Sequence, residues 1–141
     1  FHLQQILPPA YQKYVIERLK KYEKVYRLIE QEKIGQKLQQ AAVFWDFDLY
    51  YEMHELLEQD WQNASGDRRR ALQGLIRGVG MKIHAENNNM RAAISMGTKA
   101  QVDLQKYGRE LAGFVKLDAI LAEIERITAA TGKRTGGNRG N

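Results

Sequence analysis

Apolar residues recur every three or four positions along most of this 141-residue chain, which is the spacing of one face of an α-helix. The clearest stripe lies between residues 10 and 32 and consists of Tyr11, Val15, Leu19, Tyr22, Tyr26 and Ile29. Similar stripes follow near residues 34–45, 49–61, 68–86, 90–107 and 118–130, and no segment alternates with the period of two that strands show. The pattern therefore predicts an all-α protein, a single irregular bundle of five or six helices.

The chain divides into three parts by composition. Residues 1–33 hold the long amphipathic helix that follows Pro8 and Pro9, and residues 34–130 hold the bundle, whose last helix we expect Asp118 to cap. Residues 131–141 consist of Thr, Gly, Lys, Arg and Asn without periodicity, which predicts a flexible basic tail. Because three tyrosines share the stripe of the first helix, we expect it to dock on the bundle and to contribute to a homodimer.

Composition restricts the compartment and the partners. The chain has no cysteine, which excludes disulfides and thiolate metal sites and favours the cytoplasm. No apolar run approaches the roughly 18 residues of a membrane span. The formal net charge of +5 leaves nucleic-acid binding open through basic residues at 68–70, Arg77, Lys82 and the tail. Their dispersion over several helices makes solvated surface the favoured interpretation.

Residues 41–64 form an acidic stretch with six Asp and Glu and no Lys or Arg. On a helix with His54 at zero, Glu58 falls at about +40°, Trp61 at about −20° and Tyr50 at about −40°. Leu49, Met53, Leu56 and Leu57 extend the apolar arc on one side. We therefore expect His54 and Glu58 to point inward, where they need polar partners.

The helix expected at 68–86 would supply those partners. Arg69 and Gln73 flank its apolar stripe, so Arg69 would bring the positive charge that the acidic stretch lacks. Gly74, Gly78 and Gly80 predict close approach of a neighbouring helix and a central position. The result would be a buried polar cluster or binding pocket for an unnamed small ligand, made of Tyr50, Tyr51, His54, Glu58, Trp61, Arg69 and Gln73.

A metal site is the alternative. His54 and Glu58 have the spacing of the first and second ligands of a His-Glu-x-x-His helix, with Glu55 as candidate general base and His84 as candidate third ligand. These residues would make the protein a divalent-metal hydrolase, with zinc as the expected ion. Catalysis remains open at this point, and a non-catalytic binding or structural module is the preferred interpretation.

Several motifs resemble a known family. They are Tyr50-Tyr51-Glu52-x-His54-Glu55-x-x-Glu58-x-x-Trp61, then Gly66, Arg69, Gln73-Gly74-Leu75-Ile76, His84 and Asn89-x-x-Ala92-Ala93. Over about residues 45–121 the chain is similar to the helical family catalogued as domain of unknown function 309. The resemblance implies a helical bundle and no known activity, although the family's His-Glu motif has been likened to those of zinc endopeptidases. Asp48, Asn88 and Ala92 stand where the family tends to have Gly.

Overall fold

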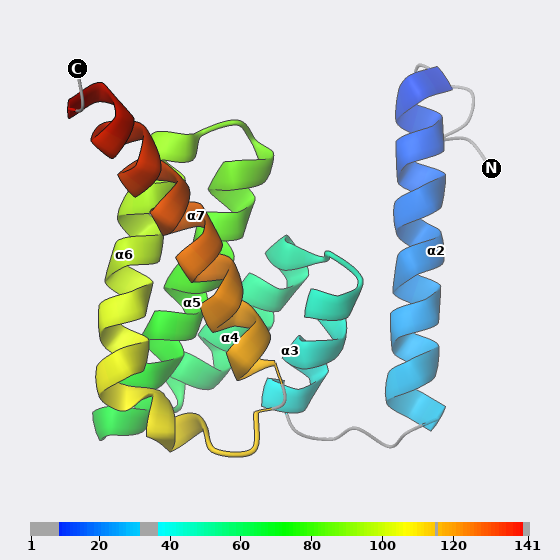
Figure 1. Cartoon of the computed structure of the whole chain (residues 1–141). Helices are drawn as coiled ribbons and strands as arrows, with labels where there is room; N and C mark the ends of the chain where they lie inside the picture. The colour runs from blue at the N-terminus through cyan, green and yellow to red at the C-terminus, as the bar shows by residue number, and fades with distance from the viewer. Residues whose placement is uncertain (1–8, 32–36, 115, 140–141) are drawn as a thin grey trace. The chain divides into compact units, whose positions relative to one another are not determined.

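The computed structural model describes residues 9–31, 37–114 and 116–139, and these residues are almost entirely helical. Figure 1 shows the elements, which contain no strand within the described residues. They are α2 (Pro9–Gln31), α3 (Lys37–Asp46), α4 (Tyr50–Gln62), α5 (Gly66–Glu86), α6 (Met90–Tyr107), the 3₁₀ helix η1 (Gly108–Leu111) and α7 (Leu117–Arg139). The predicted all-α class is confirmed.

The chain forms two compact units, Phe1–Gly35 and Gln36–Asn141. The first contains α2, and the second contains α3 to α7 packed around one core. None of the described helices is long and apolar enough to cross a membrane.

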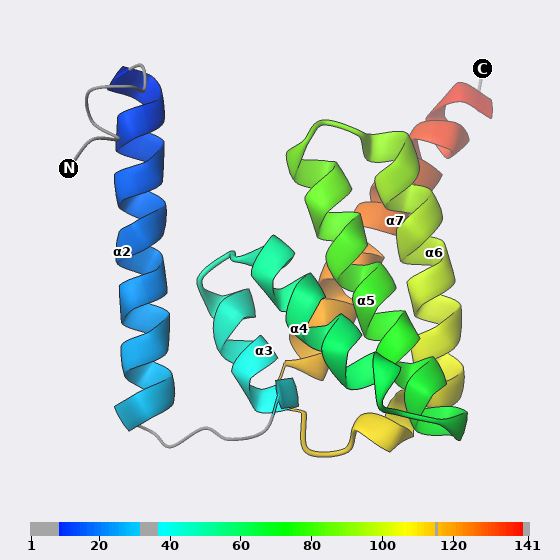
Figure 2. The same ribbon diagram turned by 180° about the vertical axis from the view of Figure 1, so that it is seen from behind.

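Helix α5 lies at the centre of the second unit, as its apolar stripe and glycines predict. It packs against α4, α6 and α7, and Figure 2 shows α4 and α6 on either side of it. Leu72, Leu75, Val79 and Met81 are fully buried on this helix. Packing against three helices explains why α5 has nine buried residues, whereas α4 has three and α6 has four.

Three glycines of α5 allow its neighbours to approach closely. A Cβ atom at Gly74 would lie 2.9 Å from Asp103 Cβ of α6, and one at Gly78 would lie 3.2 Å from Ile120 Cγ2 of α7. A Cβ at Gly80 would collide with the sulfur of Met96. The close approach expected from these glycines is confirmed.

Two sharp corners begin α4 and α6. Asp48 and Asn88 have φ angles of 57° and 59°, in the left-handed region that Asn and Asp tolerate better than other residues with a Cβ. Each lies directly before the N-cap residue of a helix, Leu49 for α4 and Asn89 for α6. These are two of the three positions where the family tends to have Gly. Asp48 and Asn88 adopt the left-handed backbone conformation that Gly would adopt there.

The last helix differs from the expectation at both ends. It begins at Leu117, so Asp118 lies within its first turn and is not the N-cap. The backbone remains helical to Arg139, through most of the segment predicted as an irregular tail. Once the turns that bury Ile120, Ile124 and Ile127 have formed, each further residue adds one helical hydrogen bond without a new nucleation cost, and composition alone does not reveal this.

Candidate functional site

The buried face of α4 is centred away from His54 and Glu58. Its core residues are Tyr50, Met53 and Leu57, whose mean direction lies about 70° from His54 and about 110° from Glu58 around the helix. The side chains of His54 and Glu58 are accordingly 35% and 44% exposed. The prediction that these two groups are buried is wrong. Both residues lie so far round the helix from the centre of its buried face that their side chains reach solvent.

His54 and Glu58 contact each other at the surface. Their Nδ1 and Oε2 atoms are 3.7 Å apart, and the two groups carry opposite charges only while the imidazole is protonated. An exposed pair of this kind within one helix contributes a few tenths of a kcal/mol, about 0.3–0.5. Tyr51 and Glu55 lie on the same side of α4 and are exposed, so these four residues form a surface that we call the α4 face.

Arg69 and Gln73 do not join His54 and Glu58. The Arg69 guanidinium lies over Trp61, with its Cζ atom 3.9 Å from the ring centroid, and within the described residues it forms no ion pair with Glu58. Gln73 lines a separate groove between α5 and α6. Arg69 lies in the exposed first turn of α5, where its guanidinium stacks on Trp61 of α4 and does not pair with Glu58.

The three candidate metal ligands are not brought together. In the part of the chain that the structure describes, no three His, Cys, Asp or Glu side chains are grouped closely enough to hold a metal ion. His84 lies in the last turn of α5, where its carbonyl oxygen accepts the Asn89 N–H at 2.9 Å. Glu55, the candidate general base, is exposed. The hydrolase interpretation is therefore left with the adjacent His54 and Glu58 as its ligands.

The best-connected polar group near α4 is Tyr50. Its side chain is 5% exposed, and its hydroxyl donates a hydrogen bond to Asp48 Oδ1 at 2.9 Å. Trp45 packs edge-on at 5.3 Å between ring centroids, and Lys82 Nζ lies 5.5 Å from the Tyr50 centroid. Burial, and then the hydrogen bond to Asp48, raise the pKa of Tyr50 far above its ordinary value. This phenol is therefore neutral throughout the physiological range and cannot serve as a base.

Lys82 extends this arrangement to α7. Its ammonium donates to Glu123 Oε1 at 2.7 Å, and Arg126 binds the same carboxylate. Hydrogen bonds from Arg126, and then from Lys82, lower the pKa of Glu123 to about 2 against the opposing effect of burial. Asp48, Tyr50, Lys82, Glu123 and Arg126 thus form one network, the Tyr50 network, which joins α4, α5 and α7 and in which every polar group has a partner.

The sequence did not identify the Tyr50 network as a unit. Lys82 and Glu123 are separated by 41 positions, and nothing in the local pattern pairs them. One local signal for part of it is Asp48. Asp tolerates a left-handed corner, and this Asp lies two residues before Tyr50, close enough to accept a hydrogen bond from its hydroxyl. Among the described residues no buried side-chain nitrogen or oxygen lacks a hydrogen bond, and in this network those bonds connect α4, α5 and α7.

These features define an all-α bundle whose conspicuous His-Glu motif lies on the surface. Residues 38–96 match the model of the family described as Domain of unknown function (DUF309), which confirms the resemblance over that stretch. The match begins earlier and ends earlier than the expected 45–121, and covers α3, α4, α5 and the beginning of α6. Searches of curated proteins and of solved structures found no match.

Proposed function

We propose that the protein is a non-catalytic interaction module that forms a homodimer through α2. The observation that carries this proposal is the row of exposed large side chains on α2: Tyr11, Tyr14, Leu19 and Tyr26 are 48–62% exposed. Monomeric proteins rarely leave a contiguous apolar patch of more than a few hundred Å² in water. Tyrosine is also among the residues that contribute most to the binding energy of interfaces.

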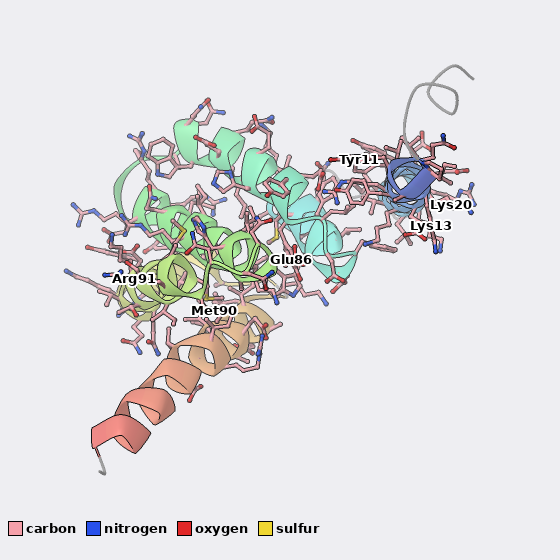
Figure 3. The ribbon with its side chains drawn as sticks, turned by 90° about the horizontal axis from the view of Figure 1, so that it is seen from above. Tyr11, Lys13, Lys20, Glu86, Met90 and Arg91 are labelled. Atoms are coloured by element: carbon pink, nitrogen blue, oxygen red, sulfur yellow. The ribbon has the colours of Figure 1, made fainter. Side chains whose placement is uncertain are left out.

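Three of these side chains share one side of α2. Tyr11, Leu19 and Tyr26 fall within about 80° of each other around the helix, whereas Lys20 lies about 180° from Tyr11. Figure 3 shows Tyr11 and Lys20 leaving α2 in different directions. An apolar stripe backed by lysines is the pattern of a helix that binds in a groove or on a helical face.

Charge selects what α2 binds in the second copy. Helix α2 carries six Lys and Arg and three Glu, so two α2 helices placed against each other would bring like charges together. Helix α4 has four Asp and Glu and no Lys or Arg. We therefore place α2 of each copy against the α4 face of the other, a reciprocal arrangement with two-fold symmetry.

The α4 face suits this contact in its chemistry. Tyr51 is 57% exposed and supplies an apolar surface, with Glu55 and the His54–Glu58 pair beside it. Lys and Arg of α2 can form ion pairs with these carboxylates at the rim of the contact, where they steer association more than they strengthen it. On this proposal, the motif that resembles a metallopeptidase helix is an interaction surface.

Sedimentation of the full chain at increasing concentration tests the proposal. We expect a dimer at high micromolar concentration, and Tyr11→Ser should weaken it by about tenfold or more. The control is Lys20→Ser on the opposite side of the same helix, about 180° from Tyr11 and at least about 100° from Tyr14, Leu19 and Tyr26, which should have little effect. A protein that remains monomeric at all concentrations would overturn the proposal.

A charge reversal tests the choice of α4. Glu55→Lys should weaken the dimer, and its effect should shrink as salt screens the charges. Glu110→Lys reverses an exposed charge on η1 and serves as the control. Equal effects of the two substitutions would exclude the α4 face as the binding partner of α2.

A further inference from the structure

A groove with basic walls lies between α5 and α6, away from the α4 face. Arg70, Gln73 and Arg77 of α5 line one side, and Val102, Asp103, Lys106 and Tyr107 of α6 line the other. Its volume is about 370 Å³, within the range of small-molecule sites. On α5 the lining residues are three and four positions apart, and on α6 two adjacent pairs, 102/103 and 106/107, lie four positions apart, so each wall is one helical stripe.

The groove exists because the two helices touch at Gly74. A Cβ there would lie 2.9 Å from Asp103 Cβ and 3.0 Å from Leu104, so the two helices approach each other closely at this point. Longer side chains next to this contact cannot lie between the helices. They turn outward and form the two walls. Arg70, Arg77 and Lys106 are therefore held on two helices that are packed tightly together.

The positive charges in the groove are only partly neutralised. Asp103 is the one carboxylate among the lining residues. Its Oδ2 accepts a hydrogen bond from Arg77 Nη1 at 2.6 Å, so its charge is neutralised by Arg77. Arg70 Nη1 donates to the Tyr107 hydroxyl at 2.6 Å, and that acceptor is neutral. Lys106 Nζ lies 5.4 Å from the centroid of the same ring. Two cations therefore converge on one phenol.

No carboxylate among the described residues lies within ion-pairing distance of Arg70 or Lys106. Asp67 acts on Arg70 only through its longer-range charge. The hydrogen bond from Arg70 and the proximity of Lys106 lower the pKa of Tyr107, which reports the positive potential at this point. A dianion with several acceptor oxygens complements such a pair of donors better than a single carboxylate does.

We propose that this groove binds the phosphoryl group of a small organic phosphate. The Arg70 guanidinium and the Lys106 ammonium hold the phosphoryl oxygens, and Val102, which is 59% exposed, contacts the organic part. Arg70 and Lys106 already lie over the ring of Tyr107, with Arg70 Cζ also 5.4 Å from its centroid. The groove has the volume of a small-molecule site, about 370 Å³, whereas single-stranded nucleic acid is bound over several nucleotides, which favours a small phosphate.

Titration calorimetry and amide chemical shifts of the full chain test this site with three probes: phenyl phosphate, inorganic phosphate and a ten-residue oligothymidylate. We expect phenyl phosphate to shift amides of residues 70–77 and 102–107 and to bind at least about fivefold more tightly than inorganic phosphate, which lacks the apolar part. Equal affinity for these two probes would overturn the assignment to an organic phosphate. Tight, strongly salt-dependent binding of the oligothymidylate would instead make the groove a nucleic-acid site and overturn the proposal.

Three variants locate the binding. Arg70→Gln and Lys106→Gln should each reduce the affinity for phenyl phosphate by about tenfold, the effect of losing one charge-assisted contact. Arg91→Gln is the control, because Arg91 lies on α6 outside the groove and points away from the bundle (Figure 3). Loss of affinity in the control equal to that in the groove variants, or no binding of phenyl phosphate to the wild-type chain, would overturn the proposal. Far-ultraviolet circular dichroism establishes that each variant is folded.

Discussion

Replacing Gly74 by alanine tests how rigidly α5 and α6 are held together. The added Cβ would lie 2.9 Å from Asp103 Cβ and 3.0 Å from two side-chain carbons of Leu104. Asp103 Cβ is bonded to the α6 backbone, so relief requires the whole helix to move. Overpacking of this kind costs about 1–3 kcal/mol, and alanine returns up to about 1 kcal/mol of helix propensity. Subtracting the second figure from the first, we expect a net loss of up to about 2 kcal/mol.

Gly80→Ala provides the matched comparison on the same helix. Its Cβ would collide with the sulfur of Met96, the far part of a flexible side chain that can change rotamer. The gain in helix propensity then offsets most of the strain, and the net change should stay within about 0.5 kcal/mol. Of these two identical substitutions six residues apart, Gly74→Ala should thus be the less stable, by about 1 kcal/mol.

Urea unfolding followed by circular dichroism measures both changes. The comparison is informative because unfolded-state effects of Gly→Ala are nearly the same at the two positions. Equal stabilities of the two variants, or a Gly74→Ala protein more stable than wild type, would refute the argument from backbone proximity.

Three further substitutions examine the left-handed corner, the Tyr50 network and the stacked arginine. Asp48→Ala should cost about 1–2 kcal/mol more than Asp48→Gly in urea unfolding, because only alanine adds the cost of a left-handed backbone to the lost hydrogen bond from Tyr50. Glu123 has its pKa lowered in the folded state to about 2, so its stabilising effect is present above about pH 4.5 and is lost as pH falls towards 2. Unfolding of Glu123→Gln should show a deficit of at most about 3 kcal/mol at pH 6 that disappears near pH 2, and a deficit independent of pH would contradict the assignment. Arg69→Leu should lower stability by less than about 1 kcal/mol, since Arg69 stacks on Trp61 in an exposed position, whereas a loss of 3 kcal/mol or more would show that it neutralises a buried acid.

The helices were predictable because helical periodicity is a local property. The boundaries of α2 and α6 agree with the stripes read from the sequence to within one or two residues, and the glycines of α5 marked the central helix. The inward placement of His54 failed for a different reason. A stripe gives the direction of the buried face only to within a few tens of degrees, and His54 and Glu58 lie within that margin of the boundary with solvent.

The tertiary polar contacts could not be predicted in the same way. Lys82 pairs with Glu123 and Arg70 with Tyr107 across 41 and 37 positions, and each pairing depends on how two helices are rotated against each other. The sequence offered many Lys, Arg and Glu residues at comparable helical positions. Which of them meet depends on how the helices pack, including the close contacts at Gly74 and Gly78.

The two left-handed corners also bear on how quickly the second unit reaches its native state. Through Asp48 and Asn88, α3 joins α4 and α5 joins α6 by connections of only a few residues, and these successive helices pack on each other. Helix α4 likewise packs on α5, and α6 on α7. Most native contacts therefore form between neighbours in the sequence, which gives a low contact order and short loops to close. Helical domains of this topology fold in microseconds to milliseconds, so the apolar surfaces of α5 are exposed to other molecules only briefly after synthesis.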